Sequence, residues 1–163
     1  MELKNRFSLM LTAGLLLASC ATQQQRAERR AQTATAVTEM TARRQWHINV
    51  TAMNTVRYGT RMVTPDFFLE LRGDTLNSYL PYMGQIFVAP METNERGLNF
   101  ELPVRNFSAS QPKPHLSRME MDVTSRTETF HYVVDIDDTG KAFIRVLSHN
   151  RDAISFDGDC SLP

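Results

Sequence analysis

Apolar and polar residues alternate with a period of two along much of the chain after residue 45. Trp46, Ile48 and Val50 alternate with His47 and Asn49, a pattern typical of a strand with one buried and one solvated face. The same alternation returns in four later segments, at residues 67–71, 119–123, 130–136 and 142–146. The pattern therefore predicts a series of half-buried β-strands.

Residues that favour turns separate these segments. The predicted turns are at Gly73-Asp74, Pro81, Pro90, Pro112 to Pro114, Asp138-Thr139-Gly140 and Asn150-Arg151. Short strands joined by such turns, with no helical pattern after residue 45, predict a mainly β (α+β) fold. We expect an antiparallel meander of about eight strands in a barrel-like or sandwich domain, with an N-terminal helix covering an open end.

That helix is predicted over residues 26–44. Its apolar residues recur at spacings of four and three, at Ala27, Ala31, Ala34, Val37 and Met40. The stripe is weak and the segment contains four threonines, which lower helix propensity. We therefore expect this helix to depend on packing against the β domain.

The first nineteen residues have the organisation of a secretory signal. Lys4 and Arg6 precede an uncharged run over residues 7–18, and Leu17-Ala18-Ser19 leads directly to Cys20. The run has about a dozen residues, whereas a membrane-spanning helix needs about twenty. The order resembles a bacterial lipobox, which implies cleavage before Cys20 and lipid on its thiol. Acyl chains contribute about 0.8 kcal/mol per methylene, so multiple chains would hold the protein on a membrane.

Three segments follow from this interpretation. Residues 1–19 form a lipoprotein signal peptide, residues 20–44 a lipidated polar and helical tether, and residues 45–163 the antiparallel β domain. The tether carries five arginines against two glutamates, whereas the β domain carries eleven basic and fifteen acidic residues. A net charge near −4 gives the domain no basic face for nucleic acid.

Cys160 has no partner within the mature chain if Cys20 is lipidated, so no intramolecular disulfide is expected. It lies in the acidic stretch Asp157-Gly158-Asp159-Cys160, which should raise the pKa of the thiol. We expect a free and unreactive thiol in the C-terminal tail, and a disulfide between chains remains the alternative.

Several short motifs resemble one known family. Leu80-Pro81-Tyr82-Met83-Gly84 is followed by Ala89-Pro90-Met91 and Gly97-Leu98-Asn99-Phe100, and the closing segments contain Gly140-Lys141-Ala142, 146–151 and 154–158. Over about residues 30–159 the chain resembles the domain-of-unknown-function 4251 family of Bacteroidetes lipoproteins. The resemblance implies an organism group, an envelope location and a fold, but no catalytic residues. Met83 stands where an aromatic residue is expected.

The segment 132–139 ends in Asp135-Ile136-Asp137-Asp138-Thr139, which is similar to the first motif of haloacid-dehalogenase-type phosphotransferases. That chemistry needs further motifs more than a hundred residues downstream, and only 24 residues follow Thr139. A calcium loop fails as well, because Val146 occupies the place of its bidentate glutamate. A hairpin turn is the better interpretation.

Other candidate sites are weaker. The four histidines, at positions 47, 115, 131 and 149, show no metal-ligand spacing. Glu120, Asp122 and Glu128 are interpreted as outward residues that pair with Arg118 and Arg126 across strands, rather than as a glycosidase dyad. We therefore predict no catalytic, cofactor-binding or metal-binding residues and no cofactor.

The sequence favours a non-catalytic envelope lipoprotein that binds a small apolar ligand, a glycan or another envelope protein. Pro81, Tyr82 and Gly84 are the candidate ligand contacts, because loops on a rigid sheet often carry binding. The alternative is a periplasmic hydrolase whose acid and base converge from separate strands. The sequence leaves inner and outer membrane open. We expect the outer membrane, and the absence of an acidic cluster after Cys20 favours the periplasmic side over display on the cell surface.

Overall fold

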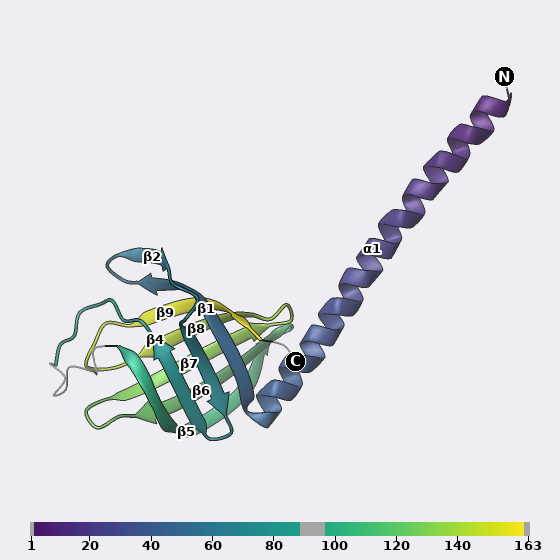
Figure 1. Ribbon diagram of the computed structural model, residues 1–163. Coiled ribbons are helices and arrows are strands. Elements are labelled where there is room, and N and C mark those ends of the chain that lie inside the picture. The colour runs from purple at the N-terminus through teal and green to yellow at the C-terminus, as the bar shows by residue number, and fades with distance from the viewer. Residues whose placement is uncertain (1, 89–96, 162–163) are drawn as a thin grey trace. The chain divides into compact units, whose positions relative to one another are not determined.

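The computed structural model describes residues 2–88 and 97–161, and only the backbone of residues 2–22. The described residues form one helix and nine strands (Figure 1). Their bounds are α1 Glu2–Arg43, β1 Gln45–Thr55, β2 Gly59–Met62, β3 Phe68–Arg72, β4 Thr75–Leu80, β5 Leu98–Lys113, β6 Leu116–Thr124, β7 Thr129–Asp137, β8 Lys141–Leu147 and β9 Ile154–Cys160. Residues 1–32 and 33–163 form two separate compact units.

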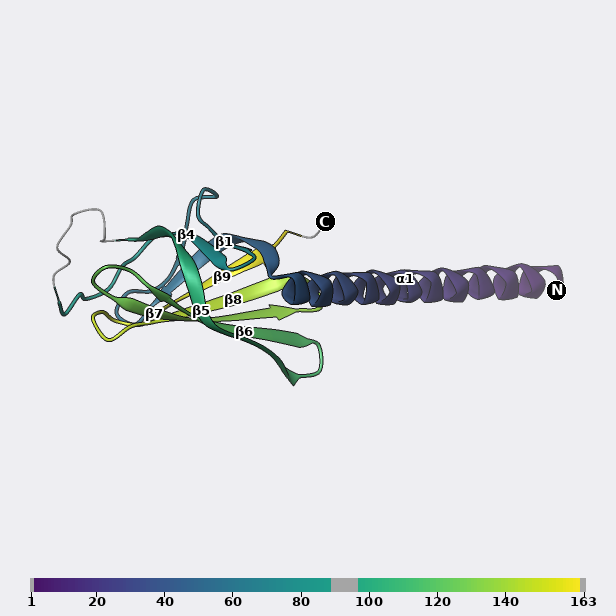
Figure 2. The same cartoon turned by 90° about the horizontal axis from the view of Figure 1, so that it is seen from below.

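All strand pairs are antiparallel, and the sheet order is β2-β1-β3-β4-β5-β6-β7-β8-β9 with an additional pairing of β1 to β9. The sheet therefore closes into an eight-stranded barrel, with β2 as an extra strand (Figures 1 and 2). The predicted meander with an N-terminal helix is confirmed. The structure settles the open choice between barrel and sandwich in favour of the barrel.

Strand β1 closes the barrel because it has partners on both edges. On one edge, Gln45–Asn49 pair with β3, and the hairpin strand β2 continues that edge along Ala52–Thr55. On the other edge, β1 pairs with β9 from Ile48↔Cys160 to Thr55↔Ile154. At Gly158 the two strands approach closely, since a Cβ there would lie 2.5 Å from the backbone oxygen of Asn49. Closure therefore depends on a glycine at this position.

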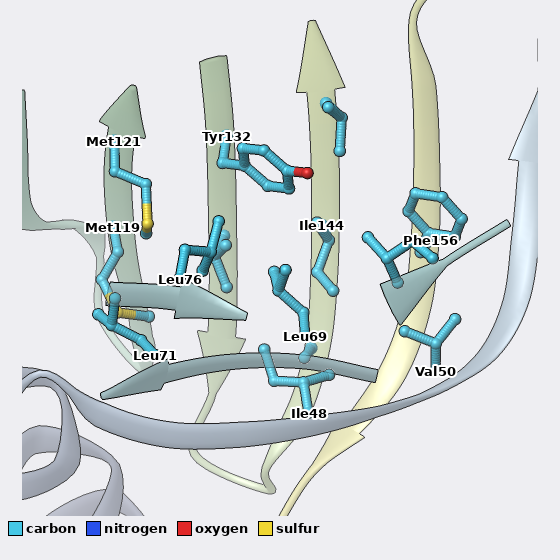
Figure 3. Packing of buried hydrophobic residues seen from close by; sticks show 14 of the residues in the cluster. Ile48, Val50, Leu69, Leu71, Leu76, Met119, Met121, Tyr132, Ile144 and Phe156 are labelled. Carbon is cyan, nitrogen blue, oxygen red and sulfur yellow. The ribbon is translucent and has the colours of Figure 1, made fainter. Parts of the chain in front are cut away.

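The alternating residues fill the barrel interior, as the sequence pattern predicted. Tyr132, Phe156, Met119 and Ile144 are among the side chains with less than 2% exposure, and they converge from different strands (Figure 3). Each such side chain contributes about 1.5–3 kcal/mol through burial. The buried Tyr132 hydroxyl lies 3.2 Å from Ser78 Oγ, so this buried polar atom has a hydrogen-bond partner.

The last turns of α1 pack on the barrel, within the unit of residues 33–163. Val37 is 2% exposed and belongs to the core cluster, and Met40 packs against that cluster. Ala27 and Ala31 of the predicted stripe are exposed. The helix therefore covers the end of the barrel at which β1 begins, and only the C-terminal part of its apolar stripe is used.

The turns lie as predicted at Gly73-Asp74 and at Asp138-Thr139-Gly140. Gly140 has φ 83°, and Asp137 Oδ1 accepts hydrogen bonds from the Thr139 and Lys141 amides, which is a hairpin turn and not a phosphotransferase motif. The turn predicted at Pro112 to Pro114 lies slightly later, because β5 extends to Lys113 and the chain reverses at Pro114 and His115. The turn predicted at Pro90 lies outside the described residues.

Candidate functional site

The meander brings three connections together at one end of the barrel, opposite the end covered by α1. They are the β4–β5 connection, described at 81–88 and 97, the β6–β7 turn at 125–128, and the β8–β9 connection at 148–153. In an up-and-down barrel, alternate turns must lie at the same end, so these segments converge despite their distance in sequence. We call this end the pocket end.

A buried ion pair joins two of these connections. Arg151 Nε lies 3.0 Å from both carboxylate oxygens of Glu128, and Arg151 Nη2 lies 2.5 Å from Oε2. The Ser148 hydroxyl also donates to Glu128 Oε1. Both charged side chains are only 5% exposed. Buried charges are tolerated in proteins when they are paired and hydrogen-bonded in this way.

Two aromatic rings enclose the guanidinium group. The Arg151 carbon Cζ lies 4.9 Å from the centre of the Tyr82 ring and 5.1 Å from that of Phe130. Both distances are in the range of cation–π contacts. The planar guanidinium of an arginine can stack on aromatic rings, so this place suits an arginine better than a lysine. Contacts with two rings and hydrogen bonds therefore both hold the Glu128–Arg151 pair in place.

Tyr82 is itself fixed by the β8–β9 connection. Its hydroxyl donates to the carbonyl oxygens of Asp152 at 3.0 Å and Gln85 at 3.1 Å. Burial raises the pKa of this hydroxyl to about 12, an effect that the nearby Arg151 charge opposes. Tyr82 is therefore a protonated hydrogen-bond donor at neutral pH and not a general base.

The Asp152 carboxylate ties the β4–β5 connection to the hairpin of β1 and β2. It accepts a hydrogen bond from the Gln85 amide at 3.0 Å and one from Arg57 Nε at 3.1 Å. The Gln85 amide is the main reason that the pKa of Asp152 is lowered. Hydrogen bonds and an ion pair thus join three connections that are distant in sequence around Arg151.

A pocket of about 260 Å³ opens beside this pair. Phe100 and Phe130 supply aromatic walls, with ring centres 5.3 Å apart and an angle of 22° between them. The full lining is Gly97, Asn99, Phe100, Leu102, Ser125, Arg126, Thr127, Glu128, Phe130 and Arg151. A second, more open depression of about 370 Å³ lies on the other side of the same β6–β7 turn, lined by 124–129 and 148–150.

The sequence profile of a protein family described as "Domain of unknown function (DUF4251)" matches residues 28–160. The chain belongs to this family. A crystal structure of a DUF4251 family protein from Bacteroides eggerthii DSM 20697 has a similar fold, with a TM-score of 0.62. The two share 12% identity over 80% of this chain and 87% of the other, so the likeness concerns the fold. No curated protein matches the chain.

The candidate contacts proposed from the sequence lie beside the DUF4251 pocket rather than in its wall. Pro81 and Tyr82 are half-buried, and Tyr82 packs on Arg151. Gly84 lies where a Cβ would come within 2.6 Å of the Tyr82 hydroxyl oxygen, so it brings the chain close to that ring. Cys20 is in α1, where only the backbone is described.

The prediction for Glu128 was wrong. It was placed outward beside Arg126, whereas its side chain is buried against Arg151. The alternation in β7 could have predicted this burial. Glu128 lies two residues before the inward-facing Phe130, so its side chain is expected on the same inner face. Asp122 and Arg118 do face outward. Asp122 pairs with His131 on the neighbouring strand at 2.7 Å, and Arg118 pairs with Asp135 at 2.7 Å.

The prediction that Cys160 lies in a C-terminal tail was wrong. Cys160 lies in β9, where it alternates inward with Phe156 and Gly158 and is 7% exposed. Burial raises the pKa of its thiol to about 11, opposed by a hydrogen bond with the His47 backbone. The cause is therefore burial rather than the neighbouring acidic residues.

Metal-binding clusters of three or more histidine, cysteine or acidic side chains do not occur in the described part of the chain. Over the same part, no helix combines the length and apolarity that crossing a membrane requires.

Proposed function

We propose that this DUF4251 protein is an envelope lipoprotein whose barrel binds a small ligand at the pocket end without transforming it. The observation that carries the binding role is the 260 Å³ pocket built on the buried Glu128–Arg151 pair. Ligand sites are concave, with apolar walls and a few fixed polar groups, and this pocket combines the aromatic walls of Phe100 and Phe130 with the fixed Glu128–Arg151 pair.

The state of Glu128 favours binding over hydrolysis. A general base or nucleophile needs an accessible carboxylate oxygen within reach of the substrate. Both oxygens of Glu128 already accept hydrogen bonds, from Arg151 and Ser148, and the side chain is 5% exposed. The pair is therefore suited to hold the shape of the pocket, and it leaves the hydrolase alternative without a free carboxylate among the residues that line the 260 Å³ pocket.

A fragment library tested against the full chain in detergent would examine the binding role, with backbone amide chemical shifts as the measurement. We expect shifts concentrated at Gly97, Ser125 and Thr127, which line the pocket. Leu102→Trp should abolish them by filling the pocket. Leu147→Trp is the matched control, because Leu147 is 37% exposed on β8 and outside the lining. Shifts that are absent, or that persist in Leu102→Trp, would remove the proposal.

The anchor is part of the same proposal and rests on the Leu17-Ala18-Ser19-Cys20 sequence. Lipid on Cys20 would place the domain on a membrane of the envelope, and we propose the periplasmic face of the outer membrane. Labelled palmitate should enter the wild type and Cys160→Ala, but not Cys20→Ala. Equal labelling of Cys20→Ala would exclude lipidation at this residue.

A further inference from the structure

The lining of the pocket indicates the chemistry of its ligand. Glu128 and Arg151 neutralise each other at the base of the pocket, with both side chains 5% exposed. The base therefore presents no net charge. An ionic ligand would have to give up its hydration without meeting an uncompensated opposite charge at this depth.

Aromatic and aliphatic side chains form the walls above this base. Phe130 is buried, whereas Phe100 and Leu102 are half-buried and line the pocket with it. Phe100 is held in place by stacking on Phe130 and by an edge contact with Tyr132, whose ring centre lies 6.4 Å away. The walls therefore offer a rigid apolar surface to one side of a ring-shaped ligand.

Neutral hydrogen-bonding groups surround the opening. The Asn99 side chain is exposed at the rim, and its carboxamide has no hydrogen-bond partner among the residues that the structure describes. Ser125 and Thr127 lie on the opposite side, and Arg126 is the other charged residue of the lining. An alkyl chain in this place would cover polar groups without replacing their bonds to water, which is unfavourable.

The same kind of lining continues across the β6–β7 turn. The second depression is bounded by hydroxyl and amide side chains, with His149 beside them, and both depressions share residues 125–128. The neutral polar residues on the far side are Thr124, Thr129, Ser148 and Asn150. A ligand with hydroxyl groups on several sides of each ring could therefore use both depressions.

We infer that the pocket end binds a neutral oligosaccharide, with the apolar face of one sugar ring against Phe100 and Leu102, and the next ring in the depression across the β6–β7 turn. This inference rests on the proposed binding function and specifies its ligand. The first pocket, at about 260 Å³, is near the lower limit of about 300 Å³ for typical ligand sites, which fits a single ring.

The test uses the full chain in an amine-oxide detergent, because detergents with sugar headgroups would compete. An array of neutral and acidic oligosaccharides would identify ligands, and titration calorimetry would measure the affinity of a neutral one. We expect binding at least tenfold weaker in Phe100→Ala and about fivefold weaker in Asn99→Ala, the loss of one hydrogen bond. Tyr58→Ala is the matched control, because Tyr58 is 55% exposed and outside both linings.

Asn99 is exposed, so its replacement tests the site without threatening the fold. No binding to any neutral glycan on the array, or equal affinity in wild type and Asn99→Ala, would overturn the inference. Dodecanoate serves as the apolar probe. If dodecanoate or fragments shift the Ser125 and Thr127 amides while glycans do not, the saccharide inference fails and the binding function stands. If none of these probes binds, both fail.

Discussion

Removal of one member of the Glu128–Arg151 pair should be far more damaging than removal of both. Each side chain is 5% exposed, so Glu128→Leu leaves a guanidinium charge buried between Tyr82 and Phe130. Arg151→Met likewise leaves a buried carboxylate, to which the Ser148 hydroxyl still donates a hydrogen bond. Breaking a buried pair in this manner costs about 3–5 kcal/mol.

The double variant Glu128→Leu/Arg151→Met removes both charges and leaves apolar side chains against two rings. Such replacements are often neutral, so we expect a loss smaller than that of either single variant. The assay is urea unfolding of the full chain followed by circular dichroism. With a slope of about 2 kcal/mol per M, each single change should lower the midpoint by roughly 2 M.

The reasoning would be refuted by additive losses. If the double variant lost about 6–10 kcal/mol, the sum expected from two independent single losses, the two residues would not form one coupled unit. Loss of less than 1 kcal/mol in both single variants would show instead that the charges are solvated.

Three further outcomes follow from the same structure. Gly158→Ala should destabilise the protein by about 1–3 kcal/mol in urea unfolding, because its Cβ would lie 2.5 Å from the Asn49 oxygen at the barrel closure. Cys160 should resist iodoacetamide at pH 8 and react in urea, as judged by peptide mass spectrometry, because a pKa of about 11 leaves about 0.1% thiolate. The Gln85 amide is the main cause of the lowered pKa of Asp152, so this carboxylate stabilises the fold above its unfolded pKa of about 3.9, and that stabilisation is lost as the pH falls through the lower folded pKa. In urea titrations, Asp152→Asn should be less stable than wild type at pH 7, and the difference should begin to shrink near pH 4 and disappear only below the folded pKa.

Strands in which every second residue is apolar and faces inward along the whole length could be predicted from the sequence. In β7, Phe130, Tyr132 and Val134 alternate with outward residues over nine positions, and the structure confirms that phase. The first half of strand β5 carries the same alternation, at Leu98, Phe100, Leu102 and Val104, and was overlooked. Its second half could not be found in this way, because residues 105–113 are exposed or half-buried and lack a period of two. The four residues of β2 are all exposed, so they too show no alternation of buried and exposed positions.

Barrel closure has no local signal. It depends on pairing between β1 and β9, which approach only where Gly158 permits, and a sandwich would have used the same strand patterns. The candidate site was missed for a related reason. Glu128 and Arg151 are 23 positions apart and become a unit only when two turns meet at the same barrel end.

The pairing of β1 with β9 also bears on how the protein acquires its structure. Contacts such as that between Asn49 and Ser161 span 112 positions, so the first strand must wait for the last before both of its edges are satisfied. A nascent chain that has not yet delivered residues 154–160 would carry two open sheet edges, at β1 and β8, which invite pairing with other chains. Premature termination near the C-terminus should therefore produce aggregates rather than a shorter, working barrel.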